Sequence, residues 1–411
     1  MGHLTPYRGN DIVSPMPPAV TVIGIGADGW PGVPEAIRER ILSASVVLGG
    51  SRHLATLPPL EGQIREAWPS PLREGLPALL WKYDGQQVVA LASGDPLVSG
   101  IGSTLIELKV PVEVVPAVSS VALAQARMRW PSETVTVVST VGRDPHAVLA
   151  ALAPGRRILV LSADESTPAN VAALLADAGY GASRITVLAD LGTEDEQRID
   201  GLASSWSAEV SRLNVIALAL AGPVVGSLTG GLPDEAFEHD GQLTKRDIRA
   251  SALSRLSPQP GQLLWDIGAG AGSIGIEWMR AHPTCRAIAI EANRERAERV
   301  TANALRLGVP SLQVVTGSAP GALEDLPAPD AIFVGGGATA TGLIENCLAA
   351  LGSGGRLVVH GVTLETETLL AAAYAEHGGE LSRIQVDHAA PIGSFTGWTP
   401  TRAVTQWMVV R

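Results

Sequence analysis

The stretch that decides the fold is LLWDIGAGAGSIGIEW, residues 263–278. An apolar run here leads into alternating glycines, Gly268, Gly270 and Gly272, and then into a helical pattern. Such glycines let the backbone turn sharply at the carboxyl end of a strand, and they let a ligand approach without meeting a Cβ atom. Strand, glycine turn and helix in this order are typical of a nucleoside-cofactor site in a parallel sheet.

Two acidic residues specify the cofactor further. The next strand, 287–290, ends at Glu291, close to the spacing of about 20 residues after the glycines at which a carboxylate accepts hydrogen bonds from ribose. Asp266 precedes the first glycine, and a carboxylate there suits a cationic methionine head better than a pyrophosphate. The glycines also run GxGxG, so we favour S-adenosylmethionine. A nicotinamide cofactor and a turn without a ligand remain as alternatives.

Two later strand ends complete this predicted site. Gly317-Ser318-Ala319-Pro320 follows one strand, where an adenine pocket is expected, so Ser318 and Ala319 are candidate cofactor contacts. The run 330–337 ends in Gly335, Gly336 and Gly337, at the crevice where the reacting substrate should lie. These glycines suit the close approach of a flat substrate, and a flexible loop is the alternative.

Outside this stretch, short β-branched runs alternate with helical patterns, which predicts mostly parallel sheets with helical crossovers. The aperiodic segment 229–242 is the best linker, so we expect a disordered leader (1–18), a first domain (19–230) and a second domain (231–411). A helix is expected over 244–256, with Thr244 as N-cap and Asp247 completing a capping box. The C-terminal segment contains two extended runs joined by a long turn-rich loop, and we expect these runs to pair as antiparallel strands at the edge of the sheet.

Composition limits the function classes. The chain has 411 residues, of which 17% are charged, as suits an α/β protein with sheets buried on both faces. A net charge of −11 without like-charge blocks argues against nucleic-acid and membrane partners. The first 18 residues lack the pattern of a signal peptide, so none is expected, and the longest apolar run, 213–228, is too short to span a bilayer. We therefore expect a cytoplasmic protein. Cys285 and Cys347 are expected to be core thiols, and no metal site is expected.

The C-terminal half resembles the CbiT-type corrinoid methyltransferase domain over about 235–411. The resemblance rests on DGQLTKRDIRA, DIGAGAGSIGIEW, AIAIEANRER, VVTGSAP and DAIFVGGG. It implies a Rossmann-like class I methyltransferase that methylates a corrin precursor at carbon 15 and removes carbon dioxide from the ring C acetate. The cofactor contacts that the resemblance implies are Thr244, Gly268, Ala269, Gly270, Ala271, Gly272, Glu291 and Ala319.

The N-terminal half resembles the tetrapyrrole methylase family, and within it the CbiE-type enzymes that act at carbon 5. The resemblance rests on Gly24-Ile25-Gly26, GGSRH (49–53), ASGDP (92–96) and PAVSS (116–120). It implies two α/β subdomains that hold folded S-adenosylmethionine between them, through Ser93, Gly94, Asp95, Ser119 and Ser120. Arg52 and His53 are candidates to hold substrate carboxylates, and a solvated helix start is the alternative.

The two resemblances in this order imply a fused enzyme of aerobic cobalamin biosynthesis. It would use two S-adenosylmethionine molecules to convert precorrin-6B to precorrin-8. We expect positional catalysis, because the sequence shows no nucleophile–base pair. Lys245, Arg246 and Arg249 are expected to bind carboxylates of this polycarboxylate substrate, and a solvated helix face is the alternative. A homo-oligomer is also expected. An RNA or protein methyltransferase and a non-catalytic scaffold are the alternative functions.

Overall fold

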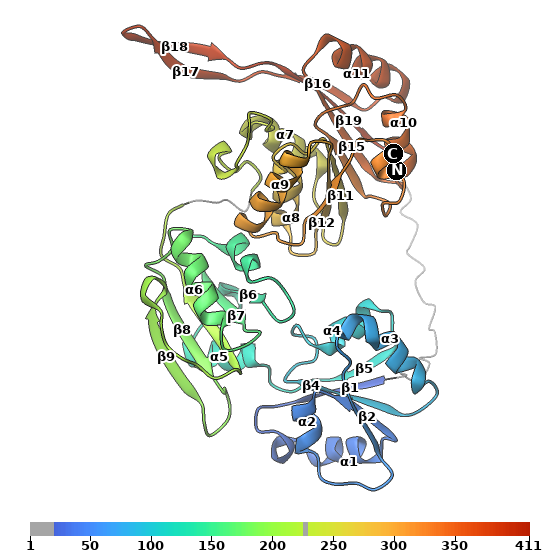
Figure 1. Cartoon of the computed structure of the whole chain (residues 1–411), viewed down its shortest axis with the longest axis vertical. Coiled ribbons are helices and arrows are strands. Elements are labelled where there is room, and N and C mark those ends of the chain that lie inside the picture. The colour runs from blue at the N-terminus through green and yellow to red at the C-terminus, as the bar shows by residue number, and fades with distance from the viewer. Residues whose placement is uncertain (1–19, 225–228) are drawn as a thin grey trace, which may run out of the picture.

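The computed structural model describes residues 20–224 and 229–411, so the predicted leader 1–18 lies outside the described residues. These residues form three main sheets, flanked by helices, and a separate two-stranded hairpin (Figure 1). Among them no helix is both long enough and apolar enough to cross a lipid bilayer. Each sheet belongs to its own unit of consecutive chain, so the three sheets can be described in sequence order.

The first sheet is entirely parallel. Its strand order is β3 (Ile64–Ala67), β2 (Val46–Gly49), β4 (Val88–Ser93), β1 (Val20–Ile25) and β5 (Val112–Val115). The crossovers carry α1 (Glu35–Ser43), α2 (Ser51–Thr56), α3 (Leu72–Lys82) and α4 (Ile101–Glu107). The central strands β1 and β4 are almost wholly buried, which is why their sequences are continuous apolar runs.

The second sheet is mixed, so the prediction of a mostly parallel sheet is wrong here. Its order is β6 (Val135–Ser139), β7 (Arg157–Leu161), β10 (Asn214–Ala219), β8 (Arg184–Ala189) and β9 (Gln197–Leu202), and only β6 and β7 are parallel. The segment that joins β8 to β9 is too short for a helical crossover, so these strands pair as a hairpin. The flanking helices are α5 (Ser120–Met128), the 3-10 helix η3 (Pro145–Ala151) and α6 (Thr167–Asp177).

The third sheet has seven strands and carries the glycine motif. Its order is β13 (Gln313–Thr316), β12 (Arg286–Glu291), β11 (Leu263–Ile267), β14 (Ala331–Val334), β15 (Arg356–Gly361), β19 (Val404–Val410) and β16 (Glu380–Ile384). The first five are parallel, and β19 runs antiparallel between β15 and the edge strand β16. The order reverses beside β11, which is where open α/β sheets bind ligands.

Helices cover both faces of the third sheet. A core cluster on one face includes Trp278 of α8 (Ser273–Ala281) and Val300 of α9 (Arg294–Arg306). The other cluster includes Ile344 of α10 (Leu343–Ala350) and Leu370 of α11 (Leu364–His377). Cys285 and Cys347 are buried free thiols, which confirms their assignment to the core.

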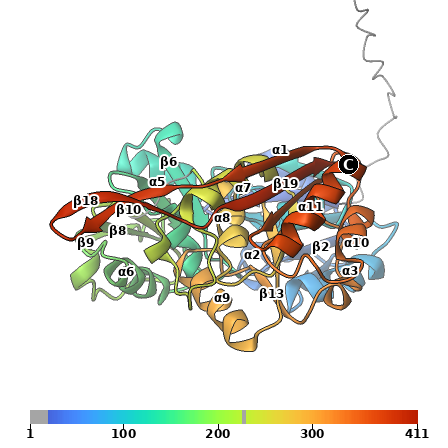
Figure 2. The same cartoon turned by 90° about the horizontal axis from the view of Figure 1, so that it is seen from above.

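Two local predictions in this unit are wrong. Helix α7 (Arg246–Leu256) has Lys245 as its N-cap and no side-chain cap, so Thr244 lies one residue before the cap. The Thr244 carbonyl accepts a hydrogen bond from the Arg249 guanidinium. The turn-rich loop is a regular antiparallel hairpin of β17 (Asp387–Ile392) and β18 (Phe395–Pro400). This hairpin extends well away from its sheet (Figures 1 and 2).

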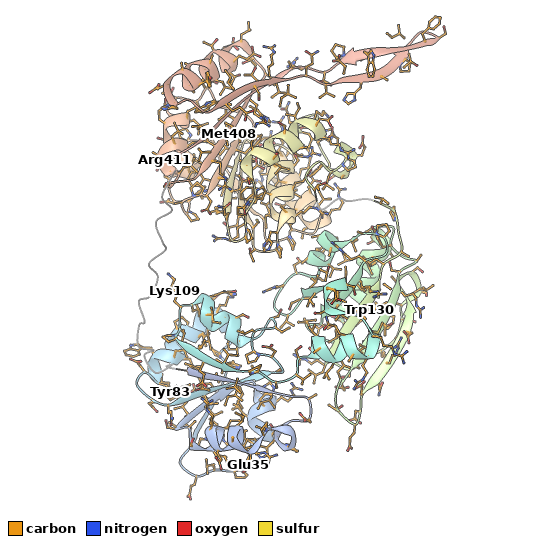
Figure 3. The ribbon with its side chains drawn as sticks, turned by 180° about the vertical axis from the view of Figure 1, so that it is seen from behind. Glu35, Tyr83, Lys109, Trp130, Met408 and Arg411 are labelled. Atoms are coloured by element: carbon orange, nitrogen blue, oxygen red, sulfur yellow. The ribbon has the colours of Figure 1, made fainter. Side chains whose placement is uncertain are left out.

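The third unit touches the second through backbone. A Cβ atom at Gly308, just after α9, would lie 2.0 Å from the Ala150 nitrogen of η3, so only glycine fits this contact. Figure 3 shows the separation of the units: Tyr83 and Lys109 label the first, Trp130 the second, and Met408 and Arg411 the third.

Candidate functional site

A cavity of about 1370 Å³ opens at the carboxyl ends of the parallel strands of the third sheet. Single ligand pockets usually measure about 300–1,000 Å³, so this cavity has room for a cofactor together with a second molecule. The sequence-predicted site residues in its wall are Thr244, Lys245, Arg246, Gly268, Ala269, Gly270, Glu291, Ser318, Ala319, Gly335, Gly336 and Gly337.

Gly268 and Gly270 allow three loops to converge on this cavity. Both have positive φ, +69° and +59°. A Cβ atom at Gly268 would lie 2.9 Å from the Gly336 nitrogen, and one at Gly270 would lie 2.8 Å from the Gln242 carbonyl oxygen. A larger residue at either position would therefore be strained and would also separate the loops.

Glu291 places a carboxylate in the cavity wall at the end of β12. Its Oε2 accepts a hydrogen bond from the Gly270 N–H at 2.8 Å, and its Oε1 accepts one from the Asn293 N–H at 3.0 Å. Both partners are backbone donors, and each carboxylate oxygen can accept further hydrogen bonds. The side chain is therefore held in place while it keeps acceptor capacity for the hydroxyl groups of a ribose.

Residues 238–242 form a strap that lies against the glycine turn. The buried Asn303 side chain bonds the backbone N–H and carbonyl of Glu238, each at 2.9 Å. Asp240 pairs with Arg296 at 2.8 Å and with Arg299 at 3.4 Å, and these guanidinium groups hold the pKa of its carboxyl well below the usual range. Helix α9 thus fixes the strap that brings the Gln242 carbonyl to the turn.

Asp266, Ala271 and Gly272 do not line the cavity, which corrects the expected contacts. Asp266 is buried, its Oδ2 accepts a hydrogen bond from the Gly275 N–H at 2.9 Å, and burial raises its pKa to about 7. Ala271 packs in the core. A Cβ atom at Gly272 would lie 2.7 Å from Val300 Cγ1, so this glycine serves helix packing.

Arg249 is also wrongly predicted, because it is fully buried and does not reach the cavity. It pairs with Glu277 at 2.5 Å and with Asp234 at 3.2 Å, and it donates to the carbonyls of Leu232 and Thr244. A buried charge is stable only with such partners. Arg249 therefore holds the segment before α7 in place and cannot bind substrate carboxylates.

The predicted cations that do reach the cavity differ in their partners. Lys245 Nζ lies 3.6 Å from an Asp234 carboxylate oxygen. Arg246 is exposed, and no ion pair to it exists within residues 20–224 and 229–411. A free guanidinium in a cavity wall is suited to bidentate binding of a carboxylate.

Sequence reasoning missed several cavity residues, among them Arg296, His360, His388 and Arg402. His360 lies near the end of β15, with its Nε2 atom 2.9 Å from Gln406 Oε1 and its ring edge-on to Phe333 at 4.8 Å. Burial lowers its pKa to about 4, so the imidazole is neutral near pH 7. The one available signal was a histidine in an otherwise apolar strand, VVHG.

The N-terminal loops also converge, at the carboxyl ends of β1, β4 and β5. The Gly94 N–H donates to the Ile25 carbonyl at 2.7 Å, and the Ala117 N–H donates to the Gly94 carbonyl at 3.3 Å. A Cβ atom at Gly24 would lie 1.9 Å from the Gly94 carbonyl oxygen. The glycines of the two motifs are thus required by contact between the loops.

Several predicted side chains beside these loops have local partners. Asp95 Oδ1 accepts a hydrogen bond from the Leu97 N–H at 2.8 Å. Ser119 caps α5 by accepting one from the Ala122 N–H at 3.1 Å, and Ser120 is the first residue of that helix. These contacts order the cofactor loops predicted from the sequence, whatever else the side chains bind.

Arg52 and His53 of α2 come together with Ser93 at the end of β4. Ser93 Oγ is 3.2 Å from His53 Nε2 and 3.3 Å from Arg52 Nη2. Burial, together with the charge of Arg52, lowers the pKa of His53 to about 4. The cluster therefore offers one cation and one neutral imidazole at the end of β4. Among the described residues no group of three His, Cys, Asp or Glu side chains is placed to hold a metal.

Two known families match the chain. The family described as Precorrin methyltransferase domain matches residues 235–411, and the family described as Tetrapyrrole (Corrin/Porphyrin) Methylases matches residues 19–205.

Curated relatives match nearly the whole chain. A protein of Sinorhizobium sp, named Precorrin-6Y C(5,15)-methyltransferase [decarboxylating], is 46% identical over 402 residues, which is 96% of each chain. A protein of Mycobacterium tuberculosis with the same name is 44% identical, covering 95% of this chain and 100% of the relative. A shorter protein of Pyrobaculum calidifontis, named Probable cobalt-precorrin-6B C(15)-methyltransferase (decarboxylating), is 34% identical over 43% of this chain and 93% of its own length.

Proposed function

From the membership of this chain in the precorrin-6Y C(5,15)-methyltransferase (decarboxylating) family, we propose that it methylates precorrin-6B at carbons 5 and 15 and removes the ring C acetate carboxylate, giving precorrin-8. It is an S-adenosylmethionine-dependent C-methyltransferase of cobalamin biosynthesis. The observation that carries the proposal is the large cavity at the switch point of the third sheet, which has space for a cofactor and a second ligand.

We assign one cofactor site to the third unit. Glu291 would accept hydrogen bonds from the ribose, and the backbone of residues 268–270 would lie against the methionine portion. Ser318 and Ala319 would border the adenine, and Thr244, two residues after the strap, would close the site. Because the glycine turn and the strap are held by hydrogen bonds and ion pairs within the protein, we expect the site to be largely formed before the cofactor binds.

A second cofactor site belongs to the N-terminal loops, giving two sites per chain. Its expected contacts are Ser93, Gly94, Asp95, Ser119 and Ser120, which lie where three loops converge. Arg52 would bind a substrate carboxylate beside this site, because its guanidinium is charged at all ordinary pH values. The neutral His53 would orient that guanidinium rather than bind a carboxylate itself.

The chemistry needs alignment more than it needs reactive side chains. When bound, the cofactor supplies an electrophilic methyl group on sulfur. Carbon 15 loses one proton as it gains a methyl group, and the acetate carbon gains one proton as carbon dioxide leaves, so these two steps balance. The main task of the protein is then to hold the reacting carbon in line with the methyl group, which can supply much of the rate.

Two glycine variants of the full chain test this proposal. Gly270→Val would displace the Gln242 strap, so it should abolish carbon 15 methylation and carbon dioxide release while one methyl transfer continues. Gly94→Val would push against the backbone of residues 118 and 119, so it should remove the carbon 5 methyl transfer alone. Mass spectrometry of precorrin-6B products and release of labelled carbon dioxide measure both outcomes.

Calorimetry with S-adenosylhomocysteine should find two sites in the wild type and one in each variant. Gly352→Val is the matched control, because a Cβ atom there would meet no other heavy atom within 4 Å, and this variant should keep both sites. Loss of all binding in one glycine variant would show a single shared site. Carbon dioxide release by Gly270→Val would contradict the assignment of decarboxylation to the third unit.

A further inference from the structure

Charged side chains are unevenly placed around the large cavity. The segment 234–247 contributes Asp234, Glu235, Lys245, Arg246 and Asp247. Other charges come from Glu291 and Arg296 beside the glycine turn and from Arg402 near the base of the hairpin. The cavity wall therefore carries its charges on the strap side, at the cofactor turn and near the hairpin.

The part of the wall formed by β14, β15 and β19 has no charged side chain. These strands are neighbours in the sheet, so their ends form one continuous surface. We call it the uncharged end, and its residues are Gly335, Gly336, Gly337, Ala340, Leu343, His360, Val362 and Val404. Arg402 lies two residues before Val404, so a cation borders the uncharged end on its outer side.

His360 is the one polar side chain of the uncharged end, and its hydrogen bond to Gln406 fixes which ring nitrogen carries the proton. Gln406 is buried and donates its amide to Ser251 Oγ at 3.3 Å, so its Oε1 faces the imidazole as an acceptor. The ring proton therefore belongs on Nε2, where it is already used. Nothing on His360 is left to donate to a carboxylate, and its low pKa agrees with a neutral ring.

Arg246 and Arg402 provide the opposite environment. They come from the start of α7 and from the segment before β19, and within the described ranges neither forms an ion pair. A carboxylate that stays on the product gains from such a guanidinium throughout the reaction. A carboxylate that leaves as neutral carbon dioxide would lose that attraction as its bond breaks, so a cation beside it would raise the barrier.

We propose that the uncharged end of the cavity receives the acetate that is lost as carbon dioxide, while Arg246 and Arg402 bind carboxylates that the product retains. This inference rests on the proposed function. In the step, the bond between the acetate methylene and its carboxylate breaks, and the electron pair passes into the conjugated ring. The methylene carbon then takes up one proton, which equals the proton that carbon 15 loses, so no oxidant or reductant is required.

The test places a charge at the uncharged end without disturbing the core. Val362 lies just after β15 and is 45% exposed, so it accepts a longer side chain. Val362→Lys adds a cation, and Val362→Met is the matched neutral control. In single turnovers with saturating cofactor and acetate-labelled precorrin-6B, we expect Val362→Lys to release carbon dioxide at least about tenfold more slowly than Val362→Met. Its KM should not rise, because the added charge binds the carboxylate before it leaves.

Arg402→Gln tests the other half of the proposal. It should raise KM for precorrin-6B and leave the ratio of carbon dioxide released to methyl groups added unchanged. Equal rates for Val362→Lys and Val362→Met, or an equal fall in both, would overturn the inference. So would a changed ratio in Arg402→Gln. Failure of the wild type to add two methyl groups and release one carbon dioxide would instead contradict the proposed function.

Discussion

Arg246 and Arg249 lie within one turn of α7, yet they have different environments. Both are basic residues close in sequence, so the sequence pattern predicts the same role for both, the binding of substrate carboxylates. The difference depends on Glu277, a distant residue of α8 whose carboxylate is buried against Arg249. The glycine turn and Glu291 were predictable because local spacing defines them, whereas burial of one arginine depends on a partner that local pattern does not reveal.

Substitution of these two arginines should separate stability from substrate binding. Arg249→Lys loses the fork that reaches four partners and leaves Glu277 poorly paired, so we expect a loss of about 3 kcal/mol in the free energy of unfolding of this unit. Arg246→Gln should leave that free energy unchanged and raise KM for the corrin substrate. Denaturant unfolding and steady-state kinetics measure the two effects. A stable Arg249→Lys protein with only a raised KM would contradict this division.

Among the elements, the buried parallel strands were the most predictable, because their β-branched runs are long and apolar. Strand β9 was missed, since QRIDGL has no buried residue and most of its exposed positions are polar. The hairpin β17–β18 was missed because it contains glycine and prolines and packs against no core. Strand direction in the second sheet also could not be inferred from the runs themselves, because the length of each connection decides it.

The hairpin can be removed at a defined point. Beneath it, the Thr401 N–H donates to the Val386 carbonyl at 2.9 Å, so the two chains are already adjacent there. Replacing residues 387–400 by Asn-Gly should close this pair with a two-residue turn. Because the cofactor loops lie on other strands, we expect affinity for S-adenosylhomocysteine at the third unit to stay within about twofold of the wild type.

Calorimetry of the shortened chain, with Gly94→Val present to silence the other site, measures that affinity directly. The Gly94→Val protein that keeps residues 387–400 is the control. Loss of cofactor binding would show that the hairpin supports the turn at β11, contrary to this description.

At the scale of the whole molecule, three sheets follow one another along the chain, and the order of their units was predictable from two groups of motifs. The residue at which the third unit begins was harder to predict. Glu277 accepts hydrogen bonds from the backbone N–H groups of Gly231 and Leu232, and the Leu232 side chain is buried in its core. The linker-like composition of 229–242 therefore conceals residues that belong to the fold.

Two fragments should show where this unit begins. A fragment of residues 229–411 keeps both N–H groups that bind Glu277, so we expect it to fold and to release carbon dioxide from precorrin-6B. A fragment of residues 233–411 loses them and leaves a buried carboxylate with fewer donors, so it should unfold at a lower temperature. Thermal unfolding followed by circular dichroism compares them, and equal midpoints would place the boundary after Leu232.

The hairpin that extends from the third sheet also determines which part of the cavity wall exchanges its amide hydrogens fastest and which part proteases cut first. The amide groups of β19 are bonded to strands on both sides, whereas those of β17 and β18 have only each other. Amide hydrogens of an isolated hairpin should exchange with deuterium long before those of the sheet. Arg402 lies where the slowly exchanging and rapidly exchanging segments meet, so brief proteolysis should cut beside this cavity-lining residue while the seven strands stay intact.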